Sequence, residues 1–172
     1  MKRIAITLFI TLLFSPSTAF SQTRGRSTRQ RPPAKTTPTI SPVRTAGAQR
    51  VAEQIKHLTR FVYVLGGVNS GIATSDEQIR RNEAPPAIVQ QNQQNKVLVK
   101  TTIQNFRMGL DKLEIDFRAT PELQPFYIKL AGVASGAATA EELAGANQFD
   151  RAGRTLLDVV NRLADVLVIM RQ

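Results

Sequence analysis

The stretch FVYVLGGVNSGIATSDE, residues 61–77, decides the fold, because it returns as FYIKLAGVASGAATAEE at residues 126–142. Nine of the 17 aligned positions are identical without a gap. Turn chemistry explains shared glycines, but it does not explain shared Phe, Val and Ser. We therefore interpret the pair as an internal duplication with units at about 43–107 and 108–172. The identical pairs are Phe61/Phe126, Leu65/Leu130, Gly67/Gly132, Val68/Val133, Ser70/Ser135, Gly71/Gly136, Ala73/Ala138, Thr74/Thr139 and Glu77/Glu142.

Each copy predicts a helix, a short loop and a second helix. The helix is expected to end at the glycine of L-x-G, because glycine adopts the left-handed cap conformation at little cost. Ser-Gly then makes the turn, and a Thr three residues before a Glu predicts a capping box at the next helix. The residues assigned to these loops and caps are Gly67, Ser70, Gly71, Thr74 and Glu77 in the first copy and Gly132, Ser135, Gly136, Thr139 and Glu142 in the second.

A cation site is the other interpretation of these loops. If the two loops met, their serines and carboxylates would offer oxygen ligands of the kind that calcium takes. We favour capping, which already uses at least two of the carboxylates, and expect no metal. The residues of the cation interpretation are Ser70, Asp76, Glu77, Ser135, Glu141 and Glu142.

Apolar residues recur at spacings of three and four from Ser41 to the end of the chain, which predicts an all-α bundle of about four main helices. Ser41-Pro42 fits the N-cap and first position of the first helix, and Gly66-Gly67 and Gly71 are expected to end it. A third helix of about 13 residues begins near Thr120, and the last helix has about 32 residues. An equal-length bundle does not fit these lengths. Either the chain kinks at Pro85-Pro86 so that the ends align, or part of the last helix is left for a partner chain.

Two polar features lie near the predicted core. Six consecutive amides, Gln90 to Asn95, follow the prolines and are interpreted as a solvated, frayed helix start. The alternative is a buried polar network, because Asn92 and Asn95 fall near the apolar line extrapolated back from Val99. His57 is expected to flank the first helix's apolar stripe without a catalytic role.

The composition argues against an enzyme. The 172 residues include no Cys and one His, which excludes a disulfide framework, a thiolate zinc site and a cysteine nucleophile. Ser70 and Ser135 are displaced from the central position of G-x-S-x-G, and no phosphate-binding or dinucleotide-binding loop is present. We expect no catalytic residue and no cofactor.

The first 21 residues resemble a bacterial secretory signal peptide. Two bases precede an apolar run, Ile4 to Phe14, that is too short to span a membrane, which needs about 20 residues. We place cleavage between Ser21 and Gln22, with cleavage after Ala19 as the second choice and an uncleaved anchor as the alternative. After cleavage no transmembrane helix is expected, and the destination is the periplasm or the exterior.

Residues 22–41 form a basic tail that composition predicts to be disordered. The net charge of +10 is concentrated at this end, since residues 22–50 hold seven bases and no acid while residues 51–172 are nearly neutral. The tail is either a spacer or a contact for an anionic surface, and it lacks the aromatic residues that stack on nucleic-acid bases. The candidate surface contacts are Arg24, Arg26, Arg29, Arg31 and Lys35.

Two functions follow from these features. The first is an exported, non-enzymatic helical module of the bacterial cell envelope that binds a protein partner or itself, or serves as a structural element. The second is an envelope-attached protein that docks on anionic cell-wall polymer or lipid through its basic tail.

Overall fold

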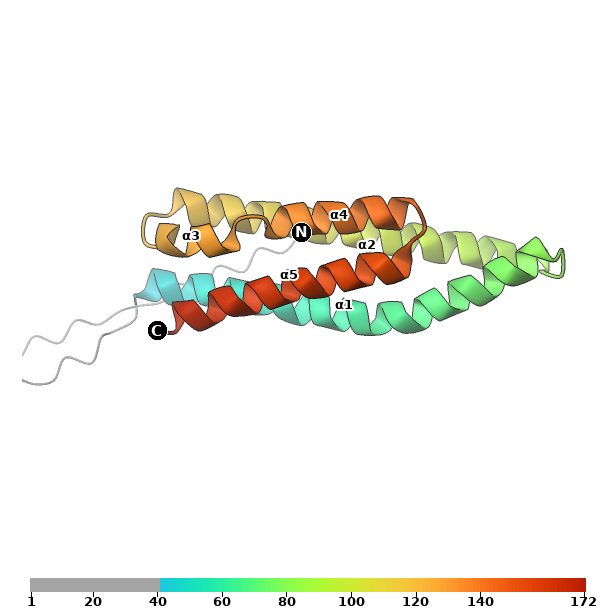
Figure 1. The fold of residues 1–172 in the computed structure, drawn as a ribbon, viewed down its shortest axis with the longest axis horizontal. Coiled ribbons are helices and arrows are strands. Elements are labelled where there is room, and N and C mark those ends of the chain that lie inside the picture. Colours follow the sequence, from blue (N-terminus) through green and yellow to red (C-terminus); the bar gives the residue numbers. More distant parts are fainter. Residues whose placement is uncertain (1–40) are drawn as a thin grey trace, which may run out of the picture. The chain divides into compact units, whose positions relative to one another are not determined.

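Five helices and no strand make up residues 41–172, the part of the chain that the computed structural model describes (Figure 1). This confirms the predicted all-α bundle of about four main helices, because the short helices α3 and α4 both pack between α2 and α5 and together take the place of one long helix. No helix in this part combines the length and apolarity that crossing a membrane requires. The helices are α1 (Pro42–Arg80), α2 (Pro86–Ala119), α3 (Gln124–Leu130), α4 (Val133–Gly145) and α5 (Phe149–Met170).

The start of α1 is as predicted, but its end is not. The Ser41 hydroxyl accepts the Val43 N–H at 3.2 Å and Pro42 takes the first helical position. The helix then continues through Gly66 and Gly67 for 39 residues, so the predicted end at these glycines and at Gly71 is wrong. Buried side chains on both sides of the glycines explain the continuity, since packing of an apolar line outweighs a weak local helix propensity. These side chains are Val51, Leu58, Leu65 and Ile72, at intervals of seven residues.

The second copy of the repeat does break at its glycine. Gly132 has a φ of +95° and separates α3 from α4, as the L-x-G interpretation predicted. The Glu114 carboxylate of α2 accepts the N–H groups of Gly132 at 3.0 Å and Ala134 at 2.9 Å, which caps the new helix. The first-copy counterpart of Glu114 is Gln49, which lies within α1 itself and cannot cap a break there. The break is therefore stabilised by a tertiary contact.

Both copies end in the same turn. Asn82 and Asn147 each have a φ of +59°. The next amide bonds back to the helix in both, from Glu83 to the Gln78 carbonyl at 2.9 Å and from Gln148 to the Leu143 carbonyl at 2.8 Å. This is a Schellman cap with Asn in place of Gly. The shared cap is consistent with a duplication, whose origin stays a prediction. It also corrects the predicted last helix of about 32 residues, because the turn at Asn147 leaves α5 with 22.

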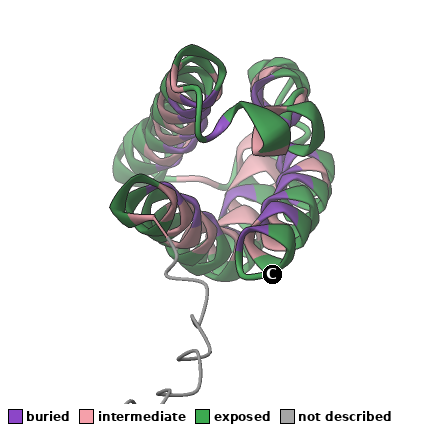
Figure 2. Cartoon of the chain, turned by 90° about the vertical axis from the view of Figure 1, so that its left-hand side faces the viewer, coloured by how far each residue is buried: buried purple, intermediate pink, exposed green. Residues whose placement is uncertain are grey.

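The helices pack in the cyclic order α1, α2, α4, α5, and their buried residues lie on the inner sides (Figure 2). Arg44 joins the first and last helices by donating from Nε to the Met170 carbonyl at 2.7 Å, and its guanidinium lies over the Phe126 ring. The α4 contribution to the core is mostly alanine, which lets α5 approach closely. A Cβ on Gly136 would lie 2.7 Å from Val159. The core outside α1 includes Val99, Ile103, Leu110, Phe117, Ala137, Ala140, Ala144, Leu156, Leu163 and Met170.

Candidate interaction surface

The hairpin of α1 and α2 extends beyond the hairpin of α4 and α5 (Figure 1). The first turns of α5 pack beside Val62 to Asn69 of α1, and the last residue of α4, Gly145, lies beside Lys100 and Gln104 of α2. Residues 70–80 of α1 and 86–99 of α2 form the end of the hairpin that reaches past these points. We call this pair the distal hairpin. The predicted mismatch of helix lengths is real, but the excess belongs to α1 and α2 and not to the last helix.

The inside of the distal hairpin contains a buried polar contact beyond the apolar Ile72 and Val99. Asn92 is 4% exposed and its Nδ2 donates to the Asp76 carboxylate at 2.6 Å. Lys96 donates to the same oxygen, also at 2.6 Å. The buried Asn92 Oδ1 has no partner in the described residues. The amide run is helical throughout, so the predicted frayed start is wrong, whereas its four glutamines are exposed as the solvated interpretation predicted. The alternative of a buried network holds for Asn92.

The outside of α2 presents a second stripe on the side of the helix opposite the core. Its members follow each other at alternating intervals of four and three residues, the spacing of a helix-packing seam. All of them are exposed, with exposed fractions of 53% for Val97, 56% for Met108 and 55% for Ile115. We call this set the outer stripe: Gln90, Gln94, Val97, Thr101, Gln104, Met108, Asp111 and Ile115.

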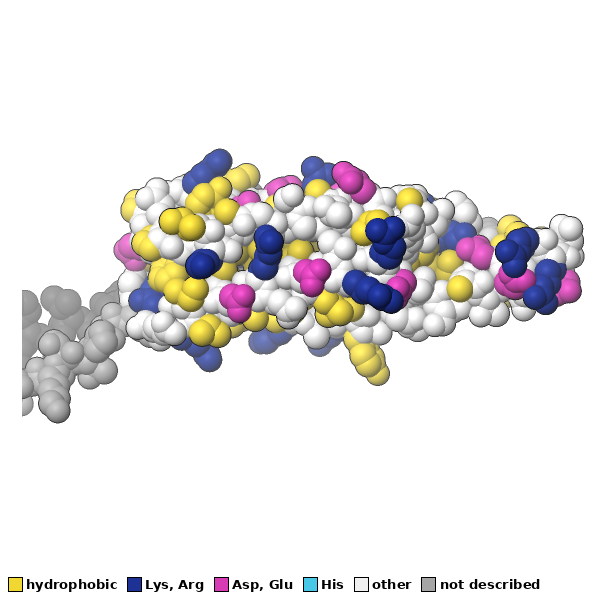
Figure 3. All heavy atoms as spheres, in the orientation of Figure 1, with side chains coloured by type: hydrophobic (Ala, Val, Ile, Leu, Met, Phe, Trp, Pro, Cys, Tyr) yellow, Lys and Arg dark blue, Asp and Glu magenta, His cyan; other side chains and the backbone are white. Residues whose placement is uncertain are grey.

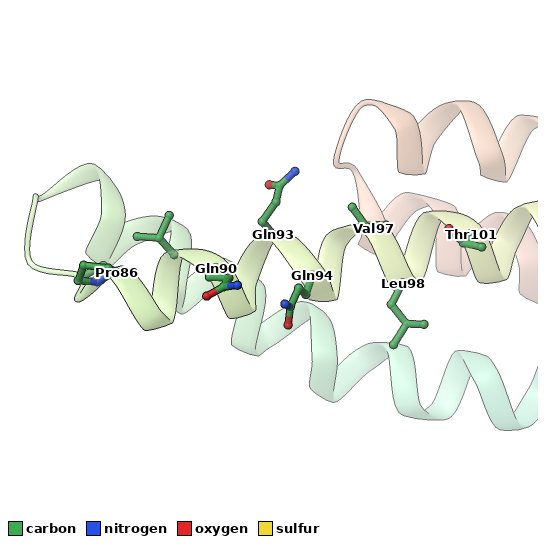
Figure 4. A pocket seen from close by; sticks show the side chains of 9 residues that line it. Pro86, Gln90, Gln93, Gln94, Val97, Leu98 and Thr101 are labelled. Atoms are coloured by element: carbon green, nitrogen blue, oxygen red, sulfur yellow. The ribbon is translucent and has the colours of Figure 1, made fainter.

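The first half of the outer stripe borders an open, mostly apolar hollow (Figure 4). Its lining comes from α2 and the preceding loop alone, so no second helix closes it. Val89 and Leu98 add to its apolar character, with exposed fractions of 42% and 66%. The lining residues are Ala84, Pro86, Val89, Gln90, Gln93, Gln94, Val97, Leu98 and Thr101.

Few charges lie along this surface. No Asp or Glu occurs between Ala84 and Leu110, and two of the three bases of that segment are paired with neighbouring helices, while the exposed Asp111 and Lys112 follow it. Lys96 pairs with Asp76, and Arg107 pairs with Glu141 of α4 at 3.0 Å. The hydrogen bond and the charge of Glu141 raise the pKa of Arg107 above its ordinary value. By contrast, the face that α3, α4 and α5 present carries charged side chains of both signs along its length (Figure 3).

The repeat residues that were predicted to build loops lie mostly inside helices. Ser70, Gly71 and Thr74 belong to the middle of α1, and Ser135, Gly136 and Thr139 belong to α4. The predicted Ser-Gly turns are therefore wrong in both copies. Gly67 is helical as well, whereas its counterpart Gly132 has the predicted left-handed conformation.

The two predicted capping boxes are also wrong. The Thr74 hydroxyl donates to the Ser70 carbonyl at 3.0 Å and the Thr139 hydroxyl to the Ser135 carbonyl at 3.2 Å, a bond made within a helix. Glu77 pairs with Arg80 and Arg81 near the end of α1 and does not reach back to a cap. Glu142 is exposed on α4.

The alternative cation site does not assemble. Asp76 is bonded within the distal hairpin, whereas Glu141 is bonded to Arg107 in the four-helix part. Among residues 41–172 no three side chains of His, Cys, Asp or Glu come close enough to hold a metal ion. His57 is exposed on α1.

The predicted signal peptide, the predicted cleavage between Ser21 and Gln22, and the tail bases fall outside the described residues. Arg44 and Arg50, counted with the basic segment, are part of the bundle. Arg44 contacts α5, and Arg50 pairs with Asp116 of α2 at 2.9 Å. The tail bases that remain as candidate contacts are Arg24, Arg26, Arg29, Arg31 and Lys35.

Comparison of the chain with protein-family models, with curated proteins and with solved structures finds no match. The functional argument therefore starts from the surface itself. Its two distinctive features are the distal hairpin and the outer stripe of α2, which holds a single charged residue.

Proposed function

We propose that the chain is an exported, non-enzymatic helical module of the bacterial cell envelope that works by binding protein through the outer side of α2. The observation that supports this is the outer stripe together with Val89 and Leu98. It is a long, partly apolar helix face that holds one charged residue, Asp111, whereas the face drawn in Figure 3 carries charged side chains of both signs. Single exposed apolar residues are ordinary on protein surfaces, but several on one side of one helix are typical of a contact surface. Here they are Val97, Met108 and Ile115 within the stripe, with Val89 and Leu98 beside it.

A pair of matched positions tests this proposal. Val97 on α2 and Val64 on α1 are the same residue type with the same exposed fraction, 53%. A photo-crosslinking amino acid is placed at either position, and the chain is irradiated in the cells that make it. We expect protein adducts from position 97 and few or none from position 64. Equal yields at both positions, or no adduct at position 97, would refute a contact surface on α2.

A second candidate function is attachment to an anionic surface through the tail, and the distribution of charge favours it. Five bases and no acid lie between residues 22 and 40, whereas residues 51–172 hold 14 bases and 13 acids. Attraction by such a segment is electrostatic, so salt weakens it. Burial of an apolar helix face responds little to moderate salt, which separates the two functions experimentally.

A further inference from the structure

We infer that the partner on the outer stripe is a second copy of this chain, bound antiparallel along α2. The inference rests on the proposed function and specifies its partner. Antiparallel pairing of one helix with itself is a two-fold arrangement, in which every contact occurs twice and the surface must match itself. The outer stripe meets that condition in its spacing, its chemistry and its charge.

The spacing of the stripe is symmetric about the middle of α2. Pairing centred between Thr102 and Ile103 places Val97 against Met108 of the second copy and Thr101 against Gln104 of the second copy. The same centre places Gln90 against Ile115 of the second copy. All eight members of the stripe therefore find a member of the other stripe, and the two apolar members nearest the centre, Val97 and Met108, meet each other.

The chemistry of the stripe is also self-matching. Glutamine and threonine side chains both donate and accept hydrogen bonds, so identical faces can satisfy each other. A lysine-rich or glutamate-rich face would repel its own copy, and the stripe holds a single charged residue, Asp111. Lys96 pairs with Asp76, and Arg107 pairs with Glu141 and with Asp111 of the stripe. The other two bases beside the stripe, Lys100 and Lys112, fall opposite the uncharged Asn105 and Gln93 of the second copy in this register.

The size of the stripe sets the expected strength. From Gln90 to Ile115 the helix is about 39 Å long at 1.5 Å per residue. One helix face of that length and a width of about 10 Å is smaller than the ~800 Å² per partner of a standard stable interface. We therefore expect a reversible dimer with a dissociation constant in the micromolar range.

The oligomeric state of the full chain tests the inference by sedimentation over a range of concentrations. The unmodified chain should pass from monomer to dimer. Val97→Lys and Met108→Glu should each weaken the dimer at least about tenfold, because each places a charge in the seam. Val64→Lys, the control on α1, should leave dimerisation unchanged within about twofold.

Mixing the two variants identifies the antiparallel register. In a mixed pair the new lysine of one chain faces the new glutamate of the other, while the second Val97–Met108 contact is intact. The mixture should therefore dimerise better than either variant alone. A monomer at every concentration, equal weakening by Val64→Lys, or no gain on mixing would overturn the inference. If the chain is a monomer at every concentration, but crosslinking from position 97 still gives adducts whose mass is not that of the dimer, the proposed function stands and the partner is a different protein.

Discussion

Glu114 holds the break between α3 and α4 with one carboxylate oxygen. That oxygen accepts two N–H groups, from Gly132 and Ala134, which would otherwise be unpaired at the start of α4. The negative charge also lies at the positive end of the α4 dipole. A side chain from a different helix thus replaces the cap that the local sequence, with Gly at this position, lacks.

Replacing this carboxylate tests its role. Glu114→Ala should lower the free energy of unfolding by about 1–2 kcal/mol through loss of the cap. Urea denaturation measures the change, and Asp165→Ala, an exposed acid of α5, is the matched control. If both variants lower the free energy of unfolding by the same small amount, Glu114 contributes no more to stability than an ordinary surface charge.

Thr74 offers a test with the opposite sign. As an N-cap it would have contributed about 1 kcal/mol, but it lies in the middle of α1 and bonds its hydroxyl to the preceding turn. Thr74→Ala should therefore leave stability unchanged or raise it by a few tenths of a kcal/mol, because Ala is the better helix former. Thermal and urea denaturation measure this difference. A loss near 1 kcal/mol would restore the capping-box interpretation.

At the scale of elements, one repeated sequence has two structures. Gly67 is helical and a Cβ there would meet no atom within 4 Å, whereas Gly132 has a φ of +95°. Gly67→Ala should raise the free energy of unfolding by about 0.5–1 kcal/mol, since Ala replaces Gly in an exposed helix interior. Gly132→Ala should lower it by at least about 1 kcal/mol, because a Cβ disfavours the left-handed conformation.

Urea denaturation of both variants under one condition measures the two effects. The comparison is internally controlled, since the glycines occupy the same place in the repeat and differ only in their structural context. If both substitutions change the free energy of unfolding in the same direction, then Gly67 and Gly132 do not have the different backbone conformations described above.

These two glycines also show what the sequence could predict. The helical class, the start of α1 at Ser41 and the left-handed Gly132 follow from local chemistry and periodicity. The continuity of α1 does not, because it depends on Leu65 and Ile72 being buried on both sides of the glycines. The break in the second copy depends on Glu114, 18 residues before Gly132, whose contact no local pattern contains.

The candidate surface was visible in the sequence only in part. The amide run drew attention to Asn92, and its burial against Asp76 links two helices that pattern alone does not align. The outer stripe is hard to predict from the sequence, because the stronger apolar pattern of α2, through Val99 and Ile103, describes the core. An absence of acids between Ala84 and Leu110 was the available signal.

For the whole molecule, charge separates the tail from the folded part. Deleting residues 22–40 should leave helix content and cooperative melting of the bundle nearly unchanged. If the tail binds anionic surfaces, the deletion should also weaken co-sedimentation with anionic vesicles. Salt near 0.5 M should have the same effect on the full chain, since it shortens the screening length to about 4–5 Å.

Circular dichroism and vesicle sedimentation at low and high salt measure these outcomes. The control is Arg50→Gln, which removes a base that pairs with Asp116 in the bundle and should not affect sedimentation. A full-length chain that fails to sediment with anionic vesicles at low salt would leave the tail as a spacer.

The contact between Arg44 and the Met170 carbonyl joins residues that are 126 positions apart. A chain that is synthesised, or threaded through a narrow channel, amino end first therefore exposes α1 long before α5 follows it. Until then the apolar line of Val51, Leu58 and Leu65 lacks the helix that covers much of it, and closing so long a loop is entropically costly. The order of the helices thus delays completion of the core until the last turn of α5 has been made.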